Sequence, residues 1–137
     1  MGEDRKPRSR WQTYPGKPNT NISRDEPRVT LNAKKVLLLN KKAVEALGTP
    51  AAVELKYDED TRTIGIAPMD PRDPKSFRLK ARHDKKAHYR TICAAPFCRW
   101  LDIDYKQTML FPDIDLDNEG TLTLELKTIV PVGRGFR

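Results

Sequence analysis

The sequence predicts a mainly β protein with short helices, built as two tandem βαββ units. Between residues 28 and 70 the apolar residues change from period two to helical spacing and back to period two. The same order of patterns returns between residues 77 and 127, after a proline-rich connector at 71–76. With 137 residues the chain is long enough to bury one sizeable core. These observations favour one β-rich domain made of two similar halves.

Residues 1–27 are predicted to form a flexible basic arm. Pro7, Pro15 and Pro18 interrupt any helix, and the few apolar residues cannot offset the entropy of ordering the segment. The arm has four cations, Arg5, Lys6, Arg8 and Arg10, and they precede two aromatic residues, Trp11 and Tyr14. This composition is suited to phosphate contact with some stacking on bases. A solvated tail without a partner and an arm docked through Trp11 are the alternatives.

The first unit, residues 28–70, begins with two strands and a short helix. Val29 and Leu31 alternate with polar residues, and 36–39 form a short apolar run. Asn40 can accept a hydrogen bond from the first helical turn, and Gly48 can take the left-handed conformation that ends the helix. Period two then returns on both sides of a polar turn at 58–62, which predicts a β-hairpin.

Three segments of this unit carry a resemblance to a known family: the strand end LLLN, the helix KKAVEALG and the hairpin VELKYDEDTRTIGIAP. Together they resemble the AbrB-like family, bacterial DNA-binding regulators whose β-strand, helix and hairpin units interlock as swapped hairpins. Family members commonly begin the helix with Ile-Pro, whereas this chain has Leu39-Asn40. The resemblance covers about a third of the chain.

The second unit, residues 77–127, is expected to repeat this architecture. Strand segments are predicted within 77–92, a helix over 95–102, and a hairpin that turns at 117–120. Phe97 and Leu101 of this helix, like Val44 and Leu47 of the first one, are expected to be buried between the sheets. The tandem plan is similar to the MraZ family of regulators. It implies that two copies on one chain form the barrel that AbrB-like proteins build from two chains, while homodimerisation stays open. Residues 128–137 form a tail in which 129–132 extend a strand.

Charge is segregated along the chain, whose net charge is +7. Cations dominate between residues 72 and 90, where only Asp73 and Asp84 oppose them. Carboxylates dominate between residues 101 and 126, where only Lys106 opposes them. The pattern suggests an anionic partner on one face and repulsion on the other, or else internal pairing of the two charged segments.

The resemblance implies that basic residues near the first strands and loops contact the phosphate backbone of double-stranded DNA. The matching residues of the first unit are Arg28, Lys34, Lys35, Lys41 and Lys42. The second unit offers Arg78, Lys80, Arg82, Lys85, Lys86 and Arg90. Together with the four cations of the arm they form the predicted nucleic-acid-binding set. A solvated cationic surface without a ligand is the competing interpretation.

No metal site is expected from the histidines and cysteines. His83, His88, Cys93 and Cys98 recur every fifth residue, whereas structural zinc sites use tight pairs of ligands. Both cysteines have apolar neighbours in sequence, which predicts that they act as small hydrophobic residues. The acidic run that begins at Asp113 lacks the glycine and glutamate positions of a calcium loop.

Catalysis and cofactor binding have no support in the sequence. There is no nucleophile elbow, no phosphate-cradling glycine loop, and no histidine beside a nucleophile and a carboxylate. No apolar run approaches a membrane span, and the first residues lack a secretory signal. We therefore expect a cytoplasmic DNA-binding regulator or chromosome-associated protein, with the nucleoid as one location. The alternative is a non-catalytic assembly subunit of a protein or ribonucleoprotein complex.

Overall fold

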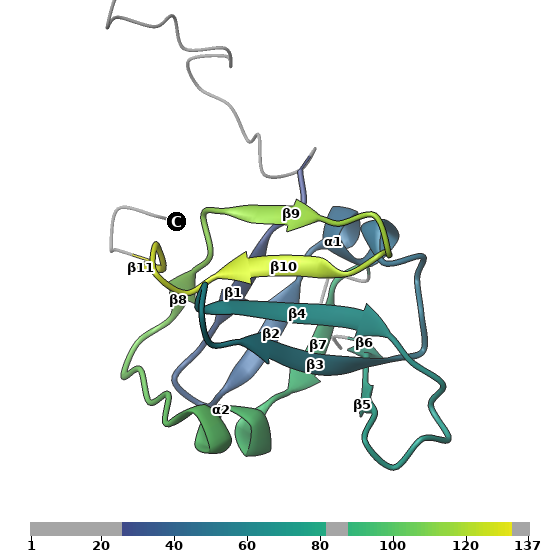
Figure 1. Ribbon diagram of the computed structural model, residues 1–137, viewed down its shortest axis with the longest axis horizontal. Coiled ribbons are helices and arrows are strands. Elements are labelled where there is room, and N and C mark those ends of the chain that lie inside the picture. The colour runs from purple at the N-terminus through teal and green to yellow at the C-terminus, as the bar shows by residue number, and fades with distance from the viewer. Residues whose placement is uncertain (1–25, 82–87, 133–137) are drawn as a thin grey trace, which may run out of the picture.

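The computed structural model describes residues 26–81 and 88–132, which form two antiparallel β-sheets with two short helices (Figure 1). The strand order is β11-β8-β1-β2-β7-β6 in one sheet, called sheet A here, and β5-β3-β4-β10-β9 in the other, called sheet B. In chain order the elements are β1 (Val29–Leu31), β2 (Val36–Leu39), α1 (Lys41–Ala46), β3 (Ala52–Asp58), β4 (Thr63–Pro68), β5 (Phe77–Arg78), β6 (Lys80–Ala81), β7 (Arg90–Cys93), α2 (Ala95–Leu101), β8 (Met109–Leu110), β9 (Ile114–Leu116), β10 (Leu122–Glu125) and β11 (Val130–Pro131). The predicted mainly β class with short helices is confirmed.

The first unit folds as its local signals predict. The Asn40 side chain accepts a hydrogen bond from the backbone N–H of Ala43 at 2.9 Å, which caps the N-terminus of α1. Gly48 has a φ of 82°, in the left-handed region that follows many helix C-termini. The next two strands pair antiparallel from Val53↔Pro68 to Asp58↔Thr63, which forms the expected hairpin.

The two halves of the chain are interleaved in each sheet. In sheet A, β2 pairs with β7, and the buried residues Leu37 and Ile92 lie directly opposite each other. In sheet B, β4 pairs with β10, and Leu122 lies opposite Ile66. Both pairings are antiparallel and join equivalent strands of the two units. Each half therefore completes both sheets of the other.

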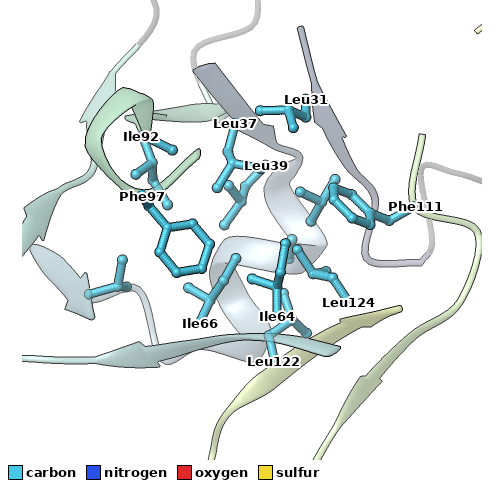
Figure 2. Close-up of a cluster of buried hydrophobic side chains, with 14 of the residues drawn as sticks. Leu31, Leu37, Leu39, Ile64, Ile66, Ile92, Phe97, Phe111, Leu122 and Leu124 are labelled. Atoms are coloured by element: carbon cyan, nitrogen blue, oxygen red, sulfur yellow. The ribbon is translucent and has the colours of Figure 1, made fainter. Parts of the chain in front are cut away.

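One hydrophobic core lies between the sheets (Figure 2). Period two sends every second residue inward, so Leu37 and Leu39 of β2 pack toward Ile64 and Ile66 of β4. The helices lie at opposite ends of the molecule in Figure 1 and each adds an apolar side to the core. The buried helical residues are Ala43, Val44, Phe97 and Cys98.

The expected barrel is not formed within the described residues. The two sheets remain open, with β11 and β6 at the edges of sheet A and β5 and β9 at the edges of sheet B. The second hairpin differs from the first because its first strand is split into two short strands, one in each sheet. Its start, β8, pairs with β1, and its end, β9, pairs with β10. Pro112 lies between them and has no N–H to continue a ladder.

Two further expectations require correction. Leu101, predicted to be buried, is only partly buried and packs against the margin of the core. Cys93 is exposed, while Cys98 is buried. Side chains alternate between the two faces of β7. Because Ile92 points into the core, the next residue, Cys93, points to solvent. The tail strand predicted at 129–132 is present as β11, which pairs with β8. The arm, except for its last residues, lies outside the described residues.

Candidate nucleic-acid interface

The predicted DNA-contacting cations are distributed over several parts of the fold. Seven of them lie outside the described residues: Arg5, Lys6, Arg8, Arg10, Arg82, Lys85 and Lys86. The others occupy the start of β1, the turn between β1 and β2, helix α1, and the strands β5 to β7. The turn before β2 and the helix after it lie at opposite ends of that strand. The structure therefore does not bring the first-unit cations to one surface.

The turn between β1 and β2 carries one exposed and one paired lysine. Lys34 is exposed, and its backbone N–H donates to the Asn32 side chain at 2.9 Å. Lys35 Nζ lies 2.7 Å from a carboxylate oxygen of Asp104, and Lys106 Nζ lies 2.7 Å from the other oxygen. Hydrogen bonds from Lys106 and Lys35 lower the pKa of Asp104 to about 2. The positive charge of Lys35 is thus partly neutralised within the fold.

The two cations of α1 share one carboxylate, and Arg28 is tied to the start of the helix through its backbone. Lys42 Nζ lies 3.7 Å from Glu45, and Lys41 Nζ lies 4.0 Å from the same side chain, so one carboxylate faces both ammonium groups. Arg28 is half-buried, and its backbone N–H donates to Asn40 Oδ1 at 2.9 Å. Arg28 therefore lies beside the start of α1, and the two lysines lie on its exposed face.

The main exposed cationic feature among these residues is the basic corner, which we define as Arg78 and Lys80. Arg90 of β7 is half-buried and lies on the same face of its strand as the inward Ile92, opposite to Lys80. Arg78 lies on β5, at an edge of sheet B, and Lys80 lies on β6, at an edge of sheet A. Only Leu79 separates these two strands, so the edges of both sheets meet here, and β7 follows alongside β6. Arg78 and Lys80 are exposed, and no carboxylate of the described residues lies within ion-pair distance of either.

Sheet B presents an acidic face to solvent. Cross-strand partners share a face, and the buried Ile64, Ile66, Leu122 and Leu124 take the inward positions. The outward positions of β3, β9 and β10 therefore carry Glu54, Asp58, Asp115 and Glu125, and Asp113 and Asp117 directly flank β9. Hydrogen bonds from the backbone N–H groups of Thr121 and Glu119 lower the pKa of Asp117, because they stabilise its charged form. Lys56 is the outward-facing cation of β3.

The acidic face and the basic corner do not neutralise each other. Arg78 lies on β5, and the acidic strand β9 lies at the opposite edge of sheet B (Figure 1). Glu54 of the acidic face lies on β3, beside β5, but forms no ion pair with Arg78. In the described ranges, every ion pair is either local in sequence or joins Lys35 to Asp104. Internal pairing between residues 72–90 and 101–126, one of the two alternatives from the sequence, is therefore not seen in these ranges.

Trp100 is the exposed residue that the predicted binding set missed. Its side chain is 70% exposed on α2, the highest value among the large hydrophobic residues that the structure describes. Arg99 lies beside it and is also exposed. The sequence held a partial signal for this position, because in a helix that turns residues 97, 98 and 101 inward, residue 99 lies on the opposite side and residue 100 at the margin of the apolar stripe.

The cysteines and histidines do not converge. Burial raises the pKa of the Cys98 thiol, whereas Cys93 faces solvent with Lys80 Nζ at 3.9 Å from its sulfur. His88 is exposed, and His83 lies outside the described residues. Within the described chain no group of three histidine, cysteine or acidic residues could hold a metal ion.

Comparisons with known proteins add no assignment. In the described ranges, the helices are too short or too polar to cross a membrane. No family model, curated protein or solved structure matches the chain. The similarity to the AbrB-like and MraZ families therefore stays a prediction.

Proposed function

We propose that this protein binds double-stranded DNA, mainly through its phosphate backbone, and acts as a DNA-binding regulator or chromosome-associated protein. The observation that carries the proposal is the basic corner. Its two exposed cations, Arg78 and Lys80, have no carboxylate partner among the described residues and lie where the edges of the two sheets meet. Arg82, Lys85 and Lys86 follow directly in the sequence and extend the same cationic stretch.

The charge distribution also orients the proposed complex. Phosphates attract the basic corner, and the acidic face of sheet B repels them, so DNA approaches from the β5–β6 side. Base reading through the major groove needs an exposed element with polar side chains. Helix α1 is six residues long and its lysines share Glu45. We therefore expect only modest sequence preference.

The interleaved halves support the family part of the proposal. AbrB-like proteins resemble this chain in using βαββ units that complete each other, and here β2·β7 and β4·β10 join the two units on one chain. We propose that the pair is a single-chain form of the swapped-hairpin arrangement, with the two sheets left open. Fold similarity by itself does not fix the function, which rests on the basic corner.

A salt titration of duplex binding tests the proposal. The logarithm of affinity should fall with the logarithm of salt by about 0.9 for each phosphate contact. If roughly six contacts form, raising salt from ~50 to ~200 mM should weaken binding about a thousandfold. The double variant Arg78→Ala/Lys80→Ala should lower the slope by about two contacts and weaken all sequences alike.

Lys56→Ala is the matched control, because it removes one exposed cation from the acidic face of sheet B. The affinity of this variant for duplex DNA should depend on salt with the same slope as that of the wild-type protein. Absence of duplex binding at low salt would contradict the proposal and favour the assembly-subunit alternative. Equal effects of the corner variant and the control would contradict the assigned surface.

A further inference from the structure

We propose that Trp100 is a stacking site for an unpaired base of single-stranded DNA, with the cations around α2 holding the adjoining phosphates. The inference extends the proposed function to a second form of the same polymer. Its experiment gives an answer whether or not duplex binding is found.

Trp100 is positioned as a platform by the residues beneath it. Phe97, which is 6% exposed, anchors α2 in the core, and the two ring centroids lie 5.9 Å apart with an interplanar angle of 48°. The neighbouring Cys98 is 2% exposed. The helix is thus fixed by its inner side, while Trp100 remains 70% exposed. A held aromatic ring loses little conformational freedom when a base stacks on it.

Cations surround α2 on the described surface. Arg99 adjoins Trp100 in the chain, and the turn carrying Lys34 and Lys35 is held against the helix start, because Ala94 N–H donates to Lys35 O at 2.9 Å. After the helix, Lys106 shares Asp104 with Lys35. Asp102 and Asp104 are the carboxylates of the segment after the helix, and Asp104 is paired with both Lys35 and Lys106. The four cations of α2 and its flanking segments therefore exceed these carboxylates by two.

The basic corner leads to this helix. Lys80 Nζ lies 3.9 Å from the sulfur of Cys93, two residues before α2 begins. At a rise of about 1.5 Å per residue, Trp100 is only about 7.5 Å along the helix axis from its start. A strand whose phosphates contact Lys80 can therefore continue along α2 toward the ring.

This combination favours nucleic acid over a protein partner. Proteins that bind single strands combine a cationic track with aromatic rings on which bases stack, and stacking tolerates any sequence because every base has a flat face. A protein hot spot of this type would instead have a rim of near-neutral contacts that exclude water. The exposed Lys34, Arg99 and Lys106, on α2 and the segments beside it, complement phosphates. A base inside a duplex cannot reach the ring, so the ligand is an unpaired strand.

Fluorescence of the full-length Trp11→Phe protein tests the inference, because Trp100 is then the sole tryptophan. An oligothymidine of about 15 nucleotides should quench and saturate the signal, and the matching duplex should not. In the same background, Trp100→Ala should weaken oligothymidine binding, measured with a labelled strand, by about tenfold. Trp100→Phe should restore much of that loss, and duplex affinity should change less than about twofold in both variants.

Leu116→Ala is the matched control, since it removes an exposed apolar side chain (45%) from β9, at the edge of sheet B opposite to β5. It should leave oligothymidine binding unchanged. The inference would be overturned if Trp100→Ala bound oligothymidine as well as the parent, or if the tryptophan signal tracked self-association in sedimentation. A response to oligouridine with none to oligothymidine would overturn the assignment to DNA. Failure of duplex binding alone would reject only the proposed function.

Discussion

Asn40 joins three segments of the chain through one buried side chain. Its Oδ1 accepts hydrogen bonds from the backbone N–H groups of Ala43 and Arg28, both at 2.9 Å. Its Nδ2 donates to the carbonyl of Glu26 at 2.8 Å. The same residue therefore caps α1 and fixes the chain where it enters β1. The side chain is 3% exposed, so water cannot replace these partners without local opening.

Asn40→Ala should lower the free energy of unfolding by about 2–3 kcal/mol, because it removes a helix cap and leaves buried backbone groups unpaired. Urea unfolding followed by circular dichroism measures the change. Asn118→Ala, in the exposed turn before β10, is the control and should change stability by less than about 0.5 kcal/mol. Equal values for the two variants would contradict the role assigned to Asn40.

Asp104 links the β1–β2 turn to the segment after α2. The hydrogen bonds from Lys106 and Lys35 lower its pKa from 3.8 to about 2. Because the folded pKa lies below the unfolded value, the ionised carboxylate favours the folded state. Its contribution is fully present above about pH 4 and is lost as the pH falls toward 2.

A carbon-detected NMR titration of the carboxyl groups should therefore show Asp104 still ionised at pH 3. Lys106→Ala should raise this pKa toward 3.8, and Lys35→Ala should raise it less, since Lys106 is the larger cause. A titration midpoint of Asp104 near 3.8 in the wild-type protein would mean that the two lysines do not contact this carboxylate when the protein is in solution.

At the scale of elements, the hairpin of the second unit depends on its turn. Asp117 Oδ1 accepts hydrogen bonds from the N–H groups of Glu119 and Thr121, both at 2.9 Å. Gly120 takes a φ of 85°, which L-residues with a Cβ rarely adopt. The turn sets the register of β9 on β10, and a slip by one residue would exchange the acidic and apolar faces.

Gly120→Ala should destabilise the protein by about 1 kcal/mol. The cause is backbone strain alone, because an added Cβ at this position meets no atom within 4 Å. Gly120→Asn should cost less, since asparagine tolerates the left-handed region. Thermal unfolding of the three proteins gives the comparison. A stable Gly120→Ala protein would show that the turn relaxes to another conformation.

For the whole molecule, the central strand pairs make the halves interdependent. Ile64 and Ile66 of the first half pack beside Leu122 and Leu124 of the second. Neither half contains a complete sheet or its own closed core. The connector at 71–76 is the point where a chain break should disturb the fold least, since it lies in a turn-rich loop.

Fragments 1–74 and 75–137, expressed separately, should not unfold cooperatively as monomers. Mixed in equal amounts, they should recover the circular dichroism spectrum and the cooperative transition of the intact chain. Size-exclusion chromatography would show a one-to-one complex. A folded monomer of either fragment would contradict the interleaved arrangement of the sheets.

The sequence by itself determined the β-rich class, the order of strands and helices in both units, and several of their boundaries. These features follow from signals within a few residues: period two, the Asn40 cap, Gly48 and the turn before β10. The helical pattern also gave a partial indication that Trp100 is exposed, although the predicted binding set omitted this residue. The predicted cations, by contrast, could not be grouped on a surface from the sequence.

Only the tertiary structure decided which strands became neighbours. It placed β8 in one sheet and β9 in the other, left the sheets open instead of forming a barrel, and exposed Cys93. It also decided that Lys35 meets Asp104, 69 residues away, while Arg78 and Lys80 lie without a carboxylate partner among the described residues. The physical reason is that period, caps and turns act over a few residues. Strand order and charge pairing depend instead on segments far apart in the chain, whose contacts form only when the common core is buried.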